Sequence, residues 1–154
     1  MGADGIHVVL TAMTAHVEHA YVQTAGWTVL DNFAINGDNT KAVVGAIQIR
    51  VVVSAMTAHT GHEGVQEYDC AALHRFTIID YWSLALRSQE LVNNNLMEST
   101  DAGGINVVLA AMTAHDGRMG VQLHGCGWLP NLACIKENNT AIVVTGGIRV
   151  VVKP

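Results

Sequence analysis

The pentapeptide AMTAH occurs three times in this chain, and each copy ends a longer repeated segment. The three segments align without gaps: GIHVVLTAMTAH from Gly5, IRVVVSAMTAH from Ile49 and GINVVLAAMTAH from Gly104. A fourth copy, GGIRVVVKP from Gly146, is incomplete. Self-similarity of this kind is the signature of one structural unit used several times, so it limits the possible folds more than any other feature.

Each complete copy is followed by a second shared segment that begins with Val-Gln. These segments are VQTAGWTVLDNFA, VQEYDCAALHRFT and VQLHGCGWLPNLA. Val22 and Val65 lie 43 residues apart whereas Val65 and Val121 lie 56 apart, so the middle unit contains an insertion of 13 residues. The insertion, at about residues 78–92, has a helical pattern of its own. It either lengthens the preceding helix or forms an additional one.

The spacing of the apolar residues predicts that both repeated segments are helices. In the first segment the apolar residues recur at i, i+3, i+4 and i+7, which is the spacing of the buried stripe of a helix. The first copy has them at Ile6, Val9, Leu10 and Met13, and the same spacing starts again at Ile49 and at Ile105. The second segment has helical spacing as well, through Val22, Ala25, Val29, Leu30 and Phe33 and their counterparts. A strand is the competing interpretation, because IQIRVVV and IRVVV are rich in β-branched residues.

A third, shorter apolar run precedes each internal copy, in NTKAVVGA, NNLMESTDAGG and NNTAIVVTGG. Asn or Thr at the start of such a run caps a helix, and glycine at its end allows the left-handed turn that terminates one. We therefore expect each unit to contain a short helix, a middle helix and a third helix.

The order of these segments resembles the armadillo repeat, most clearly in NNTAIVVTGGI and in GGINVVLAAMTAHDGRMGVQLHGCGWLPNLA. The resemblance covers most of the chain apart from the insertion. It implies an all-α, right-handed α-solenoid of about three armadillo-like repeats, with a helical insertion in the middle one. The expected single domain, 1–154, has units at about 5–35, 40–77 and 93–134 and a partial unit at 138–154.

Composition and charge narrow the class of partner. Half of the residues are hydrophobic and 14% are charged, which excludes a disordered chain. The net charge is −5, and the eight Lys and Arg residues form no basic stripe of the kind that nucleic acid requires. No apolar stretch approaches the roughly 20 residues of a membrane span. Without a signal-peptide pattern, and with three widely spaced cysteines, we expect a cytoplasmic location, with the nucleus as an alternative.

The three AMTAH histidines, His16, His59 and His115, invite a metal-site interpretation. Stacked helical units lie roughly 10 Å apart, so one histidine per unit cannot converge on a single ion whose nitrogen ligands lie near 2 Å. Histidine in the last turn of a helix serves instead to meet free carbonyl groups. The pairs His16/His19 and His59/His62 keep a histidine-mediated metal site as a remote alternative.

No pattern for catalysis stands out, so we expect no enzyme, no cofactor and no metal. Cys70 and Cys126 occupy the same register as Trp27, which suggests a small apolar filler facing neighbouring helices. Pro130 lies inside the last third helix and predicts a kink or an early helix end there.

The armadillo resemblance implies that third helices line a concave face that binds an extended polypeptide. Family members often present an Asn near the end of this helix, with a Trp one turn earlier. Asn32 and Asn131 match the Asn, whereas Arg75 replaces it in the middle unit. The Trp position is occupied by Thr28, Ala71 and Gly127. The absence of the Trp residues argues against an importin-like role. Acidic residues near this row, Asp31, Glu67 and Asp69, favour a basic or polar partner segment. With the insertion included, the predicted partner-binding residues are Gln23, Thr28, Asn32, Gln66, Arg75, Tyr81, Trp82, Gln122 and Asn131.

The sequence therefore predicts a non-enzymatic protein–protein interaction or scaffold module. The alternative is a structural subunit of a larger assembly, held through its uncapped ends and its insertion. Apolar residues at both ends of the array, such as Ile6 and Val150, have no polar cap. We therefore expect that the polypeptide is not a free monomer: it stacks with copies of itself or with another subunit, or it is a fragment of a longer array.

Overall fold

The structure is a computed structural model that describes residues 3–34, 43, 49–83, 100, 101, 103–133 and 136–146, and it describes the side chains of all of these except residues 3 and 76–83. The described residues are helical or form turns, and none of them belongs to a strand. The chain is therefore all-α, as the periodicity predicts, and the strand interpretation of IQIRVVV is wrong from Ile49 onward. No described helix is both long and apolar enough to span a bilayer.

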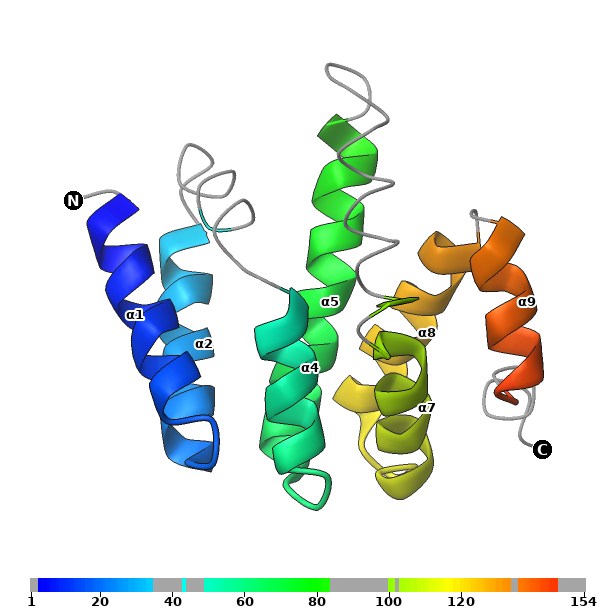
Figure 1. Cartoon of the computed structure of the whole chain (residues 1–154), viewed down its shortest axis with the longest axis horizontal. Coiled ribbons are helices and arrows are strands. Elements are labelled where there is room, and N and C mark those ends of the chain that lie inside the picture. The colour runs from blue at the N-terminus through cyan, green and yellow to red at the C-terminus, as the bar shows by residue number, and fades with distance from the viewer. Residues whose placement is uncertain are drawn as a thin grey trace.

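Seven helices are described, and six of them form three helix–turn–helix hairpins (Figure 1). Their bounds are α1 Ala3–Ala15 and α2 Ala20–Ala34, α4 Ile49–Ala58 and α5 Glu63–Ser83, α7 Gly104–Ala114 and α8 Met119–Ala133, and finally α9 Lys136–Val144. Each hairpin consists of the AMTAH helix and the Val-Gln helix predicted from the repeat. The two helices of each hairpin pack against one another.

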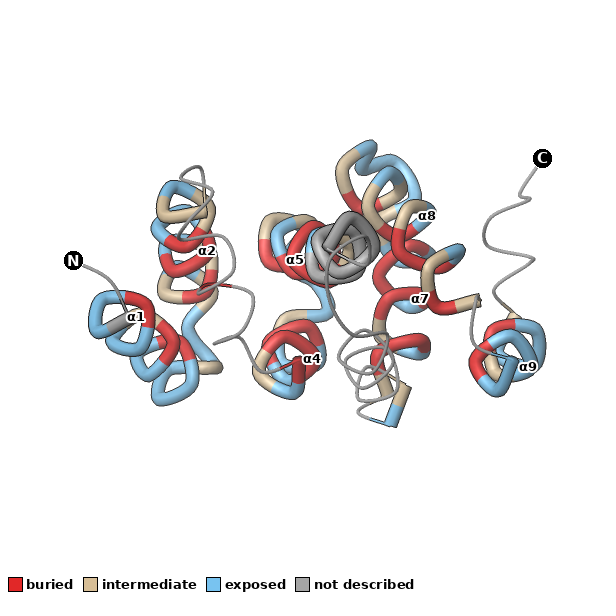
Figure 2. Tube along the Cα trace, turned by 90° about the horizontal axis from the view of Figure 1, so that it is seen from above, coloured by how far each residue is buried: buried red, intermediate tan, exposed pale blue. Residues whose placement is uncertain are grey.

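The hairpins follow one another along the long axis of the molecule and form two layers. In Figure 2, α1, α4 and α7 lie on one side, and α2, α5 and α8 lie on the other. Within the second layer α2 contacts α5 and α5 contacts α8, while α4 contacts α7 in the first layer. The α9 helix packs against α8. The core lies between the layers, where Figure 2 shows most of the buried residues.

The predicted stripe of the AMTAH helices is confirmed. Its members are buried except Val9, which is half-buried: Ile6, Leu10 and Met13 in α1, then Ile49, Val52, Val53 and Met56 in α4, and Ile105, Val108, Leu109 and Met112 in α7. The stripe predicted for α2 is only partly confirmed, because Ala25 and Val29 are exposed.

The turns also follow the sequence. Gly103 and Gly146 have φ values of 82° and 87°, which only glycine adopts readily, and each follows residues of a short helical segment. The predicted short helix is described as α9 in the last unit. In the other two units, only Val43 and the pair Thr100–Asp101 are described, and all three residues are helical.

The structure shows what happens at Pro130 and at the insertion, the two irregular features of the repeat. The α8 helix continues for three residues beyond Pro130, so the predicted early helix end is wrong. The α5 helix has 21 residues whereas α2 and α8 have 15 each, so the insertion lengthens this helix as far as Ser83. The rest of the insertion, including residues 84–92, lies outside the described residues.

Candidate functional site

The outer face of α2, α5 and α8 carries the exposed members of the predicted binding row. Thr28 and Asn32 are exposed on α2, Arg75 is exposed on α5, and Asn131 is half-buried on α8. The α2 helix contacts α5, and α5 contacts α8, so the four residues belong to one layer although they come from three different hairpins. We call this layer surface the α2/α5/α8 face. The side chains of Tyr81 and Trp82 lie outside the described residues.

The predicted role of the glutamines at the start of this row is wrong. Gln23 and Gln66 are buried and cannot reach a partner. Gln23 Nε2 donates to the carbonyl oxygens of Met13 and His16, both at 2.9 Å. Gln66 Nε2 donates to the corresponding oxygens of Met56 and His59, at 2.9 and 2.8 Å.

Gln122 repeats this arrangement in the third hairpin. Its Nε2 donates to the carbonyl oxygens of Met112 and His115, at 2.8 and 3.3 Å, and its side chain is half-buried. The last carbonyl groups of a helix lack partners within that helix. The three glutamines therefore satisfy the carbonyl ends of α1, α4 and α7 and lock each hairpin closed.

The AMTAH histidines join neighbouring hairpins. His59 Nε2 lies 2.7 Å from the carbonyl oxygen of Val17, and His115 Nε2 lies 2.8 Å from that of Thr60. Val17 and Thr60 each follow the AMTAH histidine of the preceding hairpin. These imidazoles thus meet carbonyl groups, as predicted, but the carbonyls belong to the previous unit and not to the histidine's own helix.

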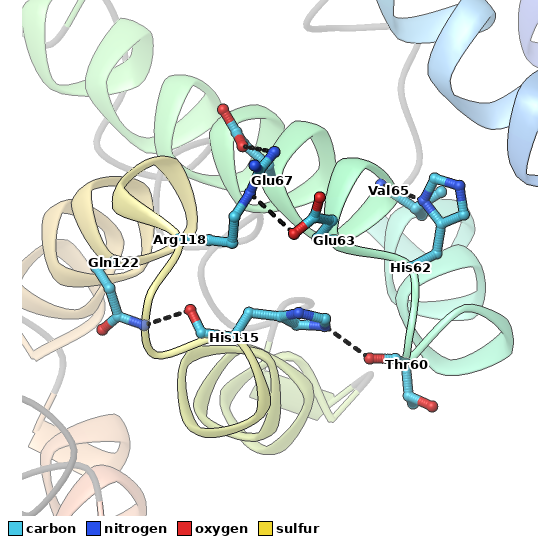
Figure 3. A network of polar contacts seen from close by, with 8 residues as sticks. All are labelled: Thr60, His62, Glu63, Val65, Glu67, His115, Arg118 and Gln122. Atoms are coloured by element: carbon cyan, nitrogen blue, oxygen red, sulfur yellow. Dashed lines mark hydrogen bonds and ion pairs between the residues drawn. The ribbon is translucent and has the colours of Figure 1, made fainter.

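A charged contact accompanies the second of these junctions (Figure 3). Arg118 Nε and Nη2 lie 3.3 Å from carboxylate oxygens of Glu63 and Glu67 respectively. Arg118 comes from the turn before α8, and both glutamates come from α5. Figure 3 shows the guanidinium between the two carboxylates, with His115 reaching toward Thr60 nearby.

The three acidic residues near the α2/α5/α8 face each interact with a side chain of this protein. Asp31 forms an ion pair with Arg75, and Glu67 pairs with Arg118. Asp69 is buried, and its Oδ1 accepts a hydrogen bond from Trp27 Nε1. Burial raises the pKa of Asp69 well above its ordinary value, against the opposing effect of the Trp27 bond.

Two histidines on the α2/α5/α8 face have no counterpart in the repeat pattern. His74 Nδ1 and His124 Nδ1 lie 3.5 Å apart, across the contact between α5 and α8. Partial burial lowers the pKa of both rings; His124 and Arg75 lower that of His74 further, and Arg75 lowers that of His124. These shifts favour the neutral form of both rings, and in that form one Nδ1 can donate to the other.

Sequence reasoning missed this pair because His74 aligns with Asp31 and Pro130, whereas His124 aligns with Ala25 and Tyr68. His74 lies outside the shared apolar pattern, whereas His124 occupies a position of the predicted buried stripe. The sequence signal for this pair was that each histidine replaces a different residue at the same position of the other Val-Gln helices. Only the packing of α5 on α8 shows that two such departures meet.

Among the described residues, no three His, Cys, Asp or Glu side chains gather in a way that could hold a metal ion. His62 Nδ1 instead accepts a hydrogen bond from the Val65 amide at 3.2 Å, at the start of α5. Cys70 is buried, and burial together with the neighbouring Asp69 raises its pKa to about 12, which suits a packed thiol and not a nucleophile. Cys126 is exposed, so the predicted filler role is wrong for that residue.

Comparisons of the chain with protein-family models, with curated protein sequences and with solved structures find no significant match. The repeat and the two layers of helices are therefore the features from which a function can be inferred.

Proposed function

We propose that this chain is a non-enzymatic interaction module of the armadillo type, with a right-handed solenoid path, and that the α2/α5/α8 face binds an extended polypeptide segment. The observation that carries the proposal is the continuous layer of third helices from three successive units. A polypeptide laid across such a layer meets the same helix position once per unit. One segment can therefore be bound at several points.

The residues on this face have the chemistry that an extended backbone requires. An asparagine amide offers both a donor and an acceptor, which matches the alternating N–H and C=O groups of a peptide. Asn32 and Asn131 supply this group at the two ends of the face. Arg75, half-exposed and paired with Asp31, lies between them in the unit order. The neutral His74–His124 pair adds a site that gains charge only below the lowered pKa values.

Selection from a random peptide library, followed by fluorescence anisotropy with the selected peptide, tests this proposal. The double variant Asn32→Ala/Asn131→Ala is expected to weaken binding by about 5- to 150-fold, because it removes two hydrogen-bonding amides of about 0.5–1.5 kcal/mol each. The control Asn139→Ala, an exposed asparagine on α9, is expected to leave binding unchanged.

Two results would contradict the proposal. One is a library that yields no peptide binding competitively to one site. The other is a selected peptide whose affinity is the same for the double variant and the control. Stoichiometric co-purification of a protein that is insensitive to the double variant would support the structural-subunit alternative instead.

A further inference from the structure

Three departures from the repeat meet where α5 packs against α8. His74 comes from α5, and His124 and Gly127 come from α8. At the equivalent positions of the contact between α2 and α5, the chain has Asp31, Tyr68 and Ala71. The second of these two contacts between hairpins therefore brings together two imidazoles and a glycine that the first contact lacks. We call His74 and His124 the imidazole pair.

The two rings of the imidazole pair turn their Nδ1 atoms toward each other. These atoms lie 3.5 Å apart, whereas the ring centres lie 5.8 Å apart, so each Nδ1 is on the side of its ring that faces the other ring. The ring planes are inclined by 56°, so the rings are not stacked. Both side chains are half-buried, which leaves the pair within reach of solvent.

Gly127 makes room for this arrangement. A Cβ atom built on Gly127 would lie 2.2 Å from Cε1 and 2.4 Å from Nε2 of His74, which is closer than real contacts allow. Glycine is less favourable than alanine in the interior of a helix such as α8. Its presence here is explained by the imidazole that occupies the space of the missing side chain.

The separation of the two Nδ1 atoms matches that of two ligands on one tetrahedral zinc ion. Zinc–nitrogen bonds of roughly 2.0–2.1 Å place two nitrogen ligands of a tetrahedral ion roughly 3.3–3.4 Å apart. The observed 3.5 Å exceeds this value by about 0.2 Å or less. Neighbouring ligands of a square-planar ion with similar bond lengths are closer, at roughly 2.8–3.0 Å. By contrast, 3.5 Å is long for a hydrogen bond, for which roughly 2.7–3.2 Å is usual.

The surroundings of the imidazole pair tolerate a cation. A metal ligand must be a neutral imidazole, and burial lowers the pKa of both rings, which favours that form. Arg75 opposes a positive charge at this place, whereas Glu67 and Asp31 favour one. Both carboxylates are already paired, Asp31 with Arg75 and Glu67 with Arg118, so the imidazoles are the ligands that this chain offers.

We propose that His74 and His124 bind one Zn²⁺ ion through their Nδ1 atoms, with water completing a tetrahedral site. The ion links α5 to α8 and thereby joins the second hairpin to the third. Two protein ligands agree with the lack of any three-ligand cluster among the described residues, and they bind zinc less tightly than the four of a structural site. The inference is independent of polypeptide binding, because the ion is bound without a partner.

Isothermal titration of the chelator-treated chain with Zn²⁺ at neutral pH tests the site. The wild type is expected to show saturable binding at the imidazole pair. His124→Tyr introduces the residue that α5 has at this position, so it is expected to fold and to lose that binding. The control His19→Tyr makes the same exchange in the His16/His19 pair, whose ring centres also lie 5.8 Å apart. It is expected to bind Zn²⁺ at the imidazole pair as the wild type does.

Two further measurements test the geometry. Gly127→Ala keeps both imidazoles but displaces the ring of His74, so it is expected to bind Zn²⁺ more weakly than the wild type. Gly117→Ala is the control, because a Cβ atom there meets nothing within 4 Å. In thermal unfolding, Zn²⁺ is expected to raise the midpoint of the wild type and of His19→Tyr but not that of His124→Tyr, since an ion bound to the native state stabilises it. The midpoint measured with chelator shows that each variant is folded.

A wild-type chain that binds no Zn²⁺ would overturn the proposal, and so would binding that is unchanged in His124→Tyr or in Gly127→Ala. Binding that is lost in His19→Tyr but kept in His124→Tyr would place the ion at His16 and His19, and it would overturn the proposal as well.

Discussion

One glutamine holds the two helices of each hairpin together, and its side chain is buried in the first two hairpins and half-buried in the third. The three glutamines each donate to two carbonyl oxygens at the end of the neighbouring helix, one from the Met and one from the His of AMTAH. Burial makes such bonds necessary, because a carbonyl group left without a donor inside the protein loses its water and gains nothing in return. A single side chain in each hairpin therefore links the end of its first helix to its second helix.

Replacing Gln66 with Leu is expected to lower the free energy of unfolding by about 2–4 kcal/mol, since it leaves the carbonyl groups of Met56 and His59 without this donor in a buried site. Gln122→Leu is expected to cost less, because that site is half-buried and water can replace part of the interaction. Urea denaturation of both variants measures the difference. Equal losses, or a stabilised Gln66→Leu, would show that the clamp is not required.

Asp69 makes stability depend on pH. Its pKa is raised in the folded state, mainly by burial, and its Oδ2 atom has no hydrogen-bond partner among the described residues. A raised folded pKa means that the contribution of this carboxyl to stability is fully present below its unfolded pKa, about 3.9, and is lost as the pH rises through the folded pKa. Asparagine does not titrate and can still accept the bond from Trp27.

Asp69→Asn is therefore expected to be more stable than the wild type at pH 7, by about 1.4 kcal/mol for each unit of raised pKa below that pH. The difference is expected to shrink as the pH falls toward 4. Urea unfolding at a series of pH values provides the measurement. A difference in stability that stays constant from pH 4 to pH 7 would mean that the carboxyl is not the titrating group.

At the scale of helices, two glycines permit α1 to approach α2 and α7 to approach α8. A Cβ atom built on Gly26 would lie within 3 Å of Met13, and one on Gly125 would lie equally close to Met112. Both methionines are buried, so neither can swing into solvent. The middle hairpin has Asp69 at this register, and its α4–α5 packing must therefore differ from that of its neighbours.

Gly26→Ala is expected to lower stability by about 1–3 kcal/mol, because overpacking at Met13 outweighs the better helix propensity of alanine. The matched control Gly5→Ala introduces the same residue into α1, where a Cβ would be in ordinary contact with Phe33 at 3.7 Å. It is expected to be neutral or stabilising by up to about 1 kcal/mol. Thermal unfolding compares the two, and a stabilised Gly26→Ala would refute the close-packing argument.

At the scale of the whole molecule, stability depends on how well each hairpin is joined to the next. The junctions combine buried apolar residues with one histidine bond apiece, and the second junction adds Arg118 with its two glutamates. Exposed ion pairs of this type contribute about 0–1 kcal/mol, so the apolar contact dominates. In the solenoid that we propose, each unit contacts its neighbours only, and stability grows with every junction formed.

His115→Ala is expected to cost about 0.5–1.5 kcal/mol, the contribution of one hydrogen bond, and to weaken the coupling between the second and third hairpins. His7→Ala, which removes an exposed histidine on α1, is the control and should change stability by less than about 0.5 kcal/mol. Hydrogen exchange of α7 and α8 relative to α4 and α5 reports the coupling. If hydrogen exchange changed equally in all three hairpins, the bond of His115 would not act specifically between the second and third hairpins.

The sequence by itself determined the helices, their pairing into similar units and the buried stripe of the AMTAH helices, because these follow from spacing within a dozen residues. Of the two outcomes predicted from Pro130, a kink or an early end of α8, the early end is wrong, since packing can hold a helix together across a proline. Only the tertiary structure decided which polar residues face a partner: Gln66 and Asn32 are both amides on third helices, yet one is buried against Met56 and the other is exposed. The roles of His59 and His74 were decided in the same way, because each depends on contacts with an element that is distant in the sequence.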